Sequence, residues 1–90
     1  MSAVKIKSEK TTEGLTVYVD PMAGFIYLKV VTGESGSVKM IITDVQGNKV
    51  AEQTVPTNQL TSIPLTGLES GFYNVKVSLS NTELSEVFRF

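Results

Sequence analysis

The sequence predicts an all-β fold in which two antiparallel sheets pack face to face. No window repeats apolar residues at helical spacing over the ten or so positions that a helix needs. Short alternating runs of Val, Ile, Thr, Tyr and Phe recur instead, separated by Gly, Asn, Asp and Pro at intervals of about ten residues. This spacing is typical of an immunoglobulin- or fibronectin-like β-sandwich, here with seven or eight strands.

Length and composition favour one small domain over residues 1–90. The chain has 90 residues, of which 41% are hydrophobic and 19% charged, with a net charge of −1. This proportion of hydrophobic to charged residues is enough for a single hydrophobic core. It is not the composition of a disordered polyelectrolyte or of a basic nucleic-acid binder. We expect a weak edge strand and a loop in residues 1–14 and the packed core in residues 15–90, with no linker or repeat.

Two strands are expected in the first third of the core. Residues 15–19 alternate apolar and polar positions and stop before Pro21, which cannot donate to a strand ladder. In residues 24–32 one face carries Ile26, Leu28 and Val30. The opposite face is also apolar, which predicts a central strand or a strand with a covered outer face.

A hairpin and an edge strand are expected in the middle of the chain. Residues 37–44 alternate, and the following Asp-Val-Gln-Gly-Asn segment at 44–48 carries the residues that tight turns prefer. Residues 49–55 form the returning strand and are polar enough for a sheet edge. Residues 59–65 contain Pro64, which again indicates an edge or short strand.

The segment 67–79 is the strongest fold signal. Leu68, Gly71 and Tyr73 are spaced as in a tyrosine corner, in which the phenol hydroxyl bonds to the backbone a few residues upstream. Alternation then predicts that Tyr73, Val75, Val77 and Leu79 face the core. Residues 83–90 form the last strand; Glu86 falls on its apolar side, so we expect a bulge or late pairing there, and a buried Phe90.

The residue inventory speaks against catalysis. Histidine and cysteine are both absent, which excludes Ser–His and Cys–His nucleophiles and His or Cys metal ligands. The carboxylates are scattered through predicted turns and solvent-facing strand positions, and no two of them form the facing pair that a glycosidase cleft requires. Asp20, Asp44 and Asn48 could offer oxygens to calcium, but turn chemistry is the better interpretation. We therefore predict no enzyme, no cofactor and no metal site.

Aromatic residues opposite the core faces are the best functional lead. Phe25, Tyr27, Val31 and Tyr18 would form an outward contact face for a protein or, in the alternative, for a carbohydrate that stacks on the rings. The simpler interpretation is that these rings cover sheet edges or the ends of the sandwich. Both interpretations stay open from the sequence.

Five segments resemble one known family in the same order. They are residues 17–21, which resemble its opening Tyr-Pro-Asn-Pro motif, then 25–30, 38–50, 65–77 with its Leu-x-x-Gly-x-Tyr pattern, and 83–90. Together they make the chain from residue 17 onward similar to the C-terminal sorting domains of the Bacteroidetes type IX (Por) secretion system, or to related small secreted domains of these bacteria.

The resemblance implies a non-catalytic exported module that acts through protein contact. Its partners would be the secretion machinery or a surface protein, and its location would be secreted, periplasmic or on the cell surface. Residues 1–10 lack the apolar region of a signal peptide, so such a signal would have been removed. No apolar run is long enough for a membrane-spanning helix.

Overall fold

The computed structural model describes residues 14–89 and contains seven strands. These are β1 (Gly14–Asp20), β2 (Phe25–Val31), β3 (Ser37–Asp44), β4 (Lys49–Pro56), β5 (Leu60–Pro64), β6 (Phe72–Ser78) and β7 (Glu83–Arg89). All regular structure in this range is strand, which confirms the all-β prediction. The strand expected within residues 1–14 and the burial expected of Phe90 lie outside the described residues.

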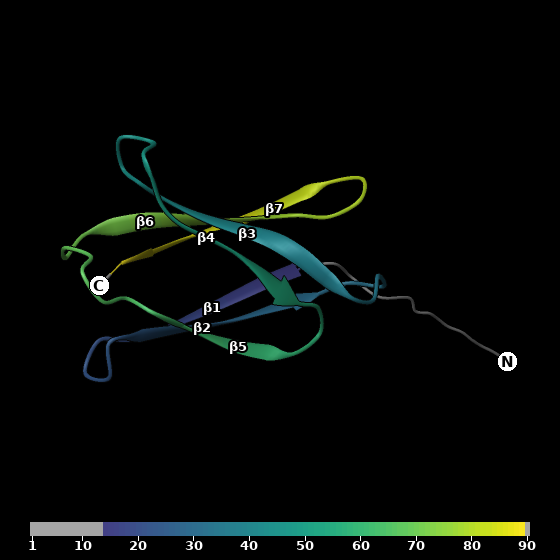
Figure 1. Cartoon of the computed structure of the whole chain (residues 1–90), viewed down its shortest axis with the longest axis horizontal. Coiled ribbons are helices and arrows are strands. Elements are labelled where there is room, and N and C mark those ends of the chain that lie inside the picture. The colour runs from purple at the N-terminus through teal and green to yellow at the C-terminus, as the bar shows by residue number, and fades with distance from the viewer. Residues whose placement is uncertain (1–13, 90) are drawn as a thin grey trace, which may run out of the picture.

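The strands form two sheets that stack as the layers of a sandwich (Figure 1). One sheet has three strands in the order β1-β2-β5, and the other has four in the order β4-β3-β6-β7. Every neighbouring pair is antiparallel. Strand β2 is central, and β4 and β5 lie at edges, as their sequences predict. Strands β1 and β7, from different sheets, lie close together along one side of the sandwich.

The core forms where the alternating apolar residues of both sheets face inward. Its fully buried side chains come from β2, β3, β6 and the end of β4; they are Ile26, Leu28, Val30, Met40, Ile42, Val55, Val75 and Val77. Strands β2, β3 and β6 bury alternate residues because successive side chains point to opposite faces. The predicted inner faces of β2, β3 and β6 are therefore confirmed.

A tight turn joins β3 to β4. The amide of Gly47 donates to the Asp44 carbonyl (3.0 Å), and the amide of Asp44 donates to the Asn48 carbonyl (2.9 Å). Gly47 has φ of +86°, a conformation that favours glycine. The hairpin predicted here is confirmed, and its register shifts between Ile42 and Thr43.

The bulge or late pairing expected in the last strand is wrong. Strand β7 pairs with β6 in continuous register from Glu83 to Arg89. Glu86 does fall on the inward side, opposite Val75, but its side chain is exposed. Because β7 is an edge strand with water beside it, the carboxylate stays hydrated without a break in the ladder.

Polar contacts tie together three loops at the other end of the sandwich. Asn58, at φ of +59°, accepts a hydrogen bond from the Thr32 amide (3.1 Å) and donates to the Glu34 carbonyl (3.3 Å). The Glu34 carboxylate accepts from the Ser80 hydroxyl (2.7 Å) and amide (3.2 Å). These contacts link the β2–β3, β4–β5 and β6–β7 connections, which lie far apart in the sequence.

Candidate contact faces

The four residues proposed from the sequence as a contact face lie together on the outer face of the three-stranded sheet. Tyr18 of β1 lies directly opposite Tyr27 of β2, and Phe25 and Val31 lie two residues before Tyr27 and four after it along β2. Directly opposed residues, and residues at even spacing along a strand, share a face. The register thus brings Tyr18, Phe25, Tyr27 and Val31 onto one surface.

This aromatic face is partly open to solvent. Tyr18 is 70% exposed, while Phe25, Tyr27 and Val31 are half-buried. The rings of Phe25 and Tyr27 stack with centroids 6.3 Å apart. Stacked and half-exposed rings give a flat apolar surface of the kind that proteins and sugars both contact.

Strand β5 adds residues that the sequence interpretation did not include in the face. Leu60 lies opposite Lys29 and is 65% exposed, and Pro64 lies opposite Phe25. The signal was present in the sequence, because Leu60 and Pro64 alternate with the inward Ile63. The outer face therefore extends across all three strands.

The turn between β1 and β2 uses Asp20 in the way that turn chemistry predicts. Its carboxylate accepts from the Ala23 amide (3.1 Å), and its carbonyl accepts from the Gly24 amide (2.9 Å). Met22 at the turn is 96% exposed. The turn thus presents one more apolar side chain at the end of the aromatic face.

Of the predicted corner residues, Leu68 and Gly71 lie in the connection before β6, and Tyr73 lies at the start of β6 with its side chain buried. The Tyr73 hydroxyl donates to the Glu69 carbonyl (2.6 Å), four residues upstream, and its ring stacks on Phe88 with centroids 5.6 Å apart. Gly71 has φ of +153°, and Leu68 packs half-buried against the core. This is the hydrogen bond that a tyrosine corner requires; the role of these residues in stability stays a prediction.

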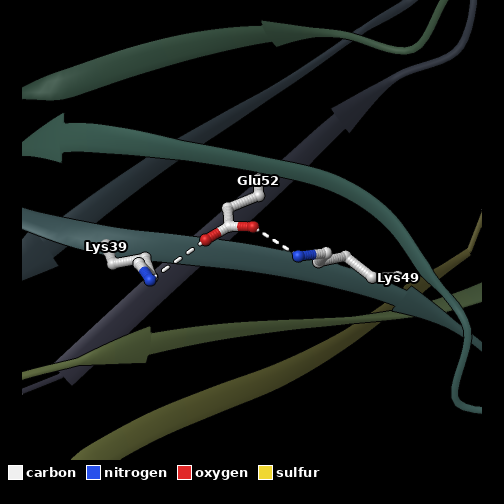
Figure 2. A network of polar contacts seen from close by, with 3 residues as sticks. All are labelled: Lys39, Lys49 and Glu52. Atoms are coloured by element: carbon white, nitrogen blue, oxygen red, sulfur yellow. Dashed lines mark hydrogen bonds and ion pairs between the residues drawn. The ribbon is translucent and has the colours of Figure 1, made fainter.

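The outer face of the four-stranded sheet is charged where the other is aromatic. Figure 2 shows Glu52 between two lysines, with its carboxylate 3.1 Å from the Lys39 ammonium and 2.5 Å from the Lys49 ammonium. The hydrogen bond from Lys49, followed by that from Lys39, holds the pKa of Glu52 below its ordinary value.

The Asp44 carboxylate at the β3–β4 turn is committed to the backbone. It accepts from the amides of Gln46 and Asn48, both at 2.9 Å. The Asn48 amide is the main reason that the pKa of Asp44 lies below its ordinary value. Across residues 14–89 no three acidic, His or Cys side chains come together as a metal site would require.

Two shallow depressions lie beside this turn. One, of about 280 Å³, is lined by Asp44 at the end of β3, Val45 of the turn, Phe72, Tyr73 and Asn74 of β6, and Val87 of β7. The other, of about 410 Å³, continues toward Glu69, Ser70 and Gly71. The sequence interpretation did not single out Val45 or Val87, because isolated apolar residues in a turn and on an edge strand carry no distinctive pattern.

The match to a known family covers nearly all of the described chain. Residues 16–88 match the family model described as the secretion system C-terminal sorting domain, as the resemblance from residue 17 implies. No curated protein gives a sequence match. No helix that could cross a membrane occurs between residues 14 and 89. Domains of this family sort Bacteroidetes proteins for type IX secretion to the cell surface or medium, and they are not catalytic. The chain belongs to the secretion system C-terminal sorting domain family.

Proposed function

We propose that this chain sorts an exported protein by binding the secretion machinery, or a surface protein, through the aromatic outer face. In this proposal the domain passes through the periplasm after removal of a signal peptide, performs no chemistry and works only by contact. The family supports the sorting role. The choice of face rests on the surface itself.

The observation that carries the choice of face is the apolar surface over β1, β2 and β5. Tyr18 and Leu60 are 70% and 65% exposed at its two sides, and the Phe25–Tyr27 stack lies between them. Aromatic residues are enriched in protein interfaces because they bury a large area with few rotatable bonds. Burying such a face against a partner would remove the unfavourable free energy of exposing apolar surface to water, which the isolated domain retains.

A reporter secretion assay tests both parts of the proposal. The domain is fused behind a folded reporter in a type IX-competent host, and reporter is measured in periplasm, at the surface and in the medium. The native domain should deliver the reporter out of the periplasm. Tyr18→Ser, combined with Leu60→Ser, should leave more of it behind, whereas Tyr18→Phe, which keeps the ring, should not.

The two failures are distinguishable. A reporter that stays in the periplasm behind a folded native domain contradicts the sorting role in that host. A Tyr18→Ser/Leu60→Ser domain that is folded and secreted as well as the native one contradicts only the choice of face. Circular dichroism of the purified domains provides the folding control.

The same rings favour a second candidate function, carbohydrate binding or adhesion. Sugar rings stack on exposed aromatic side chains, and Tyr18, Phe25 and Tyr27 offer three on one surface. A glycan array with the native domain and the Tyr18→Ser variant tests this function. If the array shows no glycan that binds the native domain but not the variant, carbohydrate binding through this face is contradicted.

A further inference from the structure

The basic side chains of the domain are segregated onto one face. Residues 14–89 contain five of them, and four project from the outer face of the four-stranded sheet: Lys39 from β3, Lys49 from β4, Lys76 from β6 and Arg89 from β7. The fifth, Lys29, lies on the aromatic face. Among residues 14–89, the acidic residues on the outer face of the four-stranded sheet are Glu52 and Glu83, although the whole chain has a net charge of −1.

Half of this positive charge has no carboxylate partner among residues 14–89. Glu52 serves both Lys39 and Lys49 (Figure 2). Lys76 and Arg89 make no ion pair with a described residue, and the Arg89 guanidinium lies 5.5 Å from the centre of the Phe72 ring. These two side chains thus carry charge that a partner could neutralise.

An apolar depression opens on the same face. Its walls include Val45, Phe72 and Val87, which are 78%, 53% and 61% exposed. Its volume of about 280 Å³ is enough for one large apolar side chain. Arg89 flanks it through its contact with Phe72, and Lys76 follows two residues after Asn74 along β6.

We propose that this basic face docks an acidic, extended segment of a partner protein that places one aromatic or aliphatic side chain in the Val45–Phe72–Val87 depression. Two residues of extended chain span about 7 Å. A carboxylate two positions from the anchoring side chain would therefore reach Lys76 when the segment runs along β6, and one four positions away would approach Lys39, which lies opposite Ser78.

The charges around the depression also set the direction of the segment. Asp44 lines this depression on the side of the β3–β4 turn, and together with Glu69 it also lines the neighbouring depression. Acidic residues of the partner should thus point away from the turn, toward Lys76. A second copy of this chain fits poorly, because it would bring two basic faces together. The inference does not depend on the aromatic face.

The experiment titrates the ¹⁵N-labelled full chain with a peptide and monitors the chemical shifts of the backbone amides. The probe is a synthetic peptide of about nine residues with one Phe and with Glu two and four positions after it, matched to a peptide with Lys in place of Glu. The Glu peptide should bind saturably and shift the amides of Val45, Phe72, Lys76 and Val87. Its affinity should fall as salt is raised from about 50 to about 500 mM.

Matched variants separate this face from the rest of the surface. Lys76→Glu should weaken binding by about tenfold, because it removes one attraction and adds a repulsion. Lys29→Glu, with the same charge change on the other sheet, should leave it unaltered. Val87→Ser should weaken binding by several-fold, and Leu60→Ser, at an equally exposed apolar position, should not.

Any of four results would overturn the inference. These are no shift changes at about 1 mM Glu peptide, equal binding of the Lys peptide, an equal loss in Lys29→Glu, and shifts confined to other strands. Binding to anionic phospholipid vesicles without peptide binding would assign the face to a membrane. If sedimentation of the native chain depends on concentration and that of Lys76→Glu does not, the basic face would be assigned to a second copy of the chain.

Discussion

The two outer faces of the sandwich differ more than the two inner faces do. Inside, both sheets present mainly β-branched and aliphatic side chains that exclude water, and the four-stranded sheet adds the stacked rings of Tyr73 and Phe88. Outside, the three-stranded sheet presents Tyr18, Phe25, Tyr27 and Leu60, whereas the four-stranded sheet presents lysines and Arg89. The same strand alternation produces both pairs of faces.

The difference indicates which residues are constrained by folding and which are not. An inward position has to be apolar and of about the right size for the sheets to pack. An outward position on a strand tolerates most residues, so sheet packing alone does not require rings to gather on one outer face or cations on the other. Contact with a partner through each outer face would account for both concentrations.

The largest expected effect compares the two faces of a single strand. Ile42 is fully buried, and its neighbour Ile41 is half-buried on the outer face, between Glu52 and Lys76. Ile42→Ala should lower the free energy of unfolding by about 3 kcal/mol, because it removes buried methyl groups and leaves a cavity. Ile41→Ala should cost about 1 kcal/mol or less. Denaturant unfolding measures both values.

Equal costs for the two isoleucine variants would contradict the assignment of faces. It would mean that Ile41 is covered as fully as Ile42, for example by a second molecule. Repeating the unfolding at several protein concentrations separates these cases, since only association makes the midpoint depend on concentration.

A smaller effect compares two tyrosines, one in the core and one on the aromatic face. Tyr73→Phe should lower the free energy of unfolding by about 1 to 2 kcal/mol, because the Glu69 carbonyl loses its hydrogen-bond donor in a partly buried site. Tyr27→Phe, on the outer face, should leave stability within about 0.5 kcal/mol of the native value. No loss in Tyr73→Phe would show that the corner hydrogen bond does not stabilise the fold.

Strand positions and inner faces could be predicted from the sequence because they depend on local alternation. The alternation of Tyr73, Val75 and Val77 with more polar residues indicates by itself which side of β6 is buried, and the Asp-Val-Gln-Gly-Asn segment at 44–48 indicates where the chain turns. The grouping of Tyr18 with Tyr27 also follows, once neighbouring strands are assumed to pair.

The basic face and the loop cluster could not be predicted in this way. Lys39, Lys76 and Arg89 come together only because β3, β6 and β7 are neighbours in one sheet, and strand order is a property of long-range pairing. The contact between Glu34 and Ser80 spans 46 residues and depends on that order as well. The bulge predicted in β7 is absent for a related reason. Desolvating the inward Glu86 carboxylate costs free energy only if the strand is covered, and β7 is an edge strand.

The smallest expected effect tests the charge arrangement of the four-stranded sheet through pH. Because Lys49 and Lys39 lower the pKa of Glu52 in the folded chain, ionised Glu52 favours the folded state above its ordinary pKa of 4.5. That contribution is lost as pH falls through the lowered value. Glu52→Gln should therefore flatten the fall in stability below about pH 4.5, whereas Glu83→Gln should retain that fall, because Glu83 makes no ion pair with a described residue.

Thermal unfolding between about pH 3 and pH 7 measures this difference, and high salt should shrink it because the Glu52 carboxylate is exposed. An unchanged acid slope in Glu52→Gln would mean that Lys39 and Lys49 do not hold this carboxylate in solution, which would leave both lysines free to meet an acidic partner.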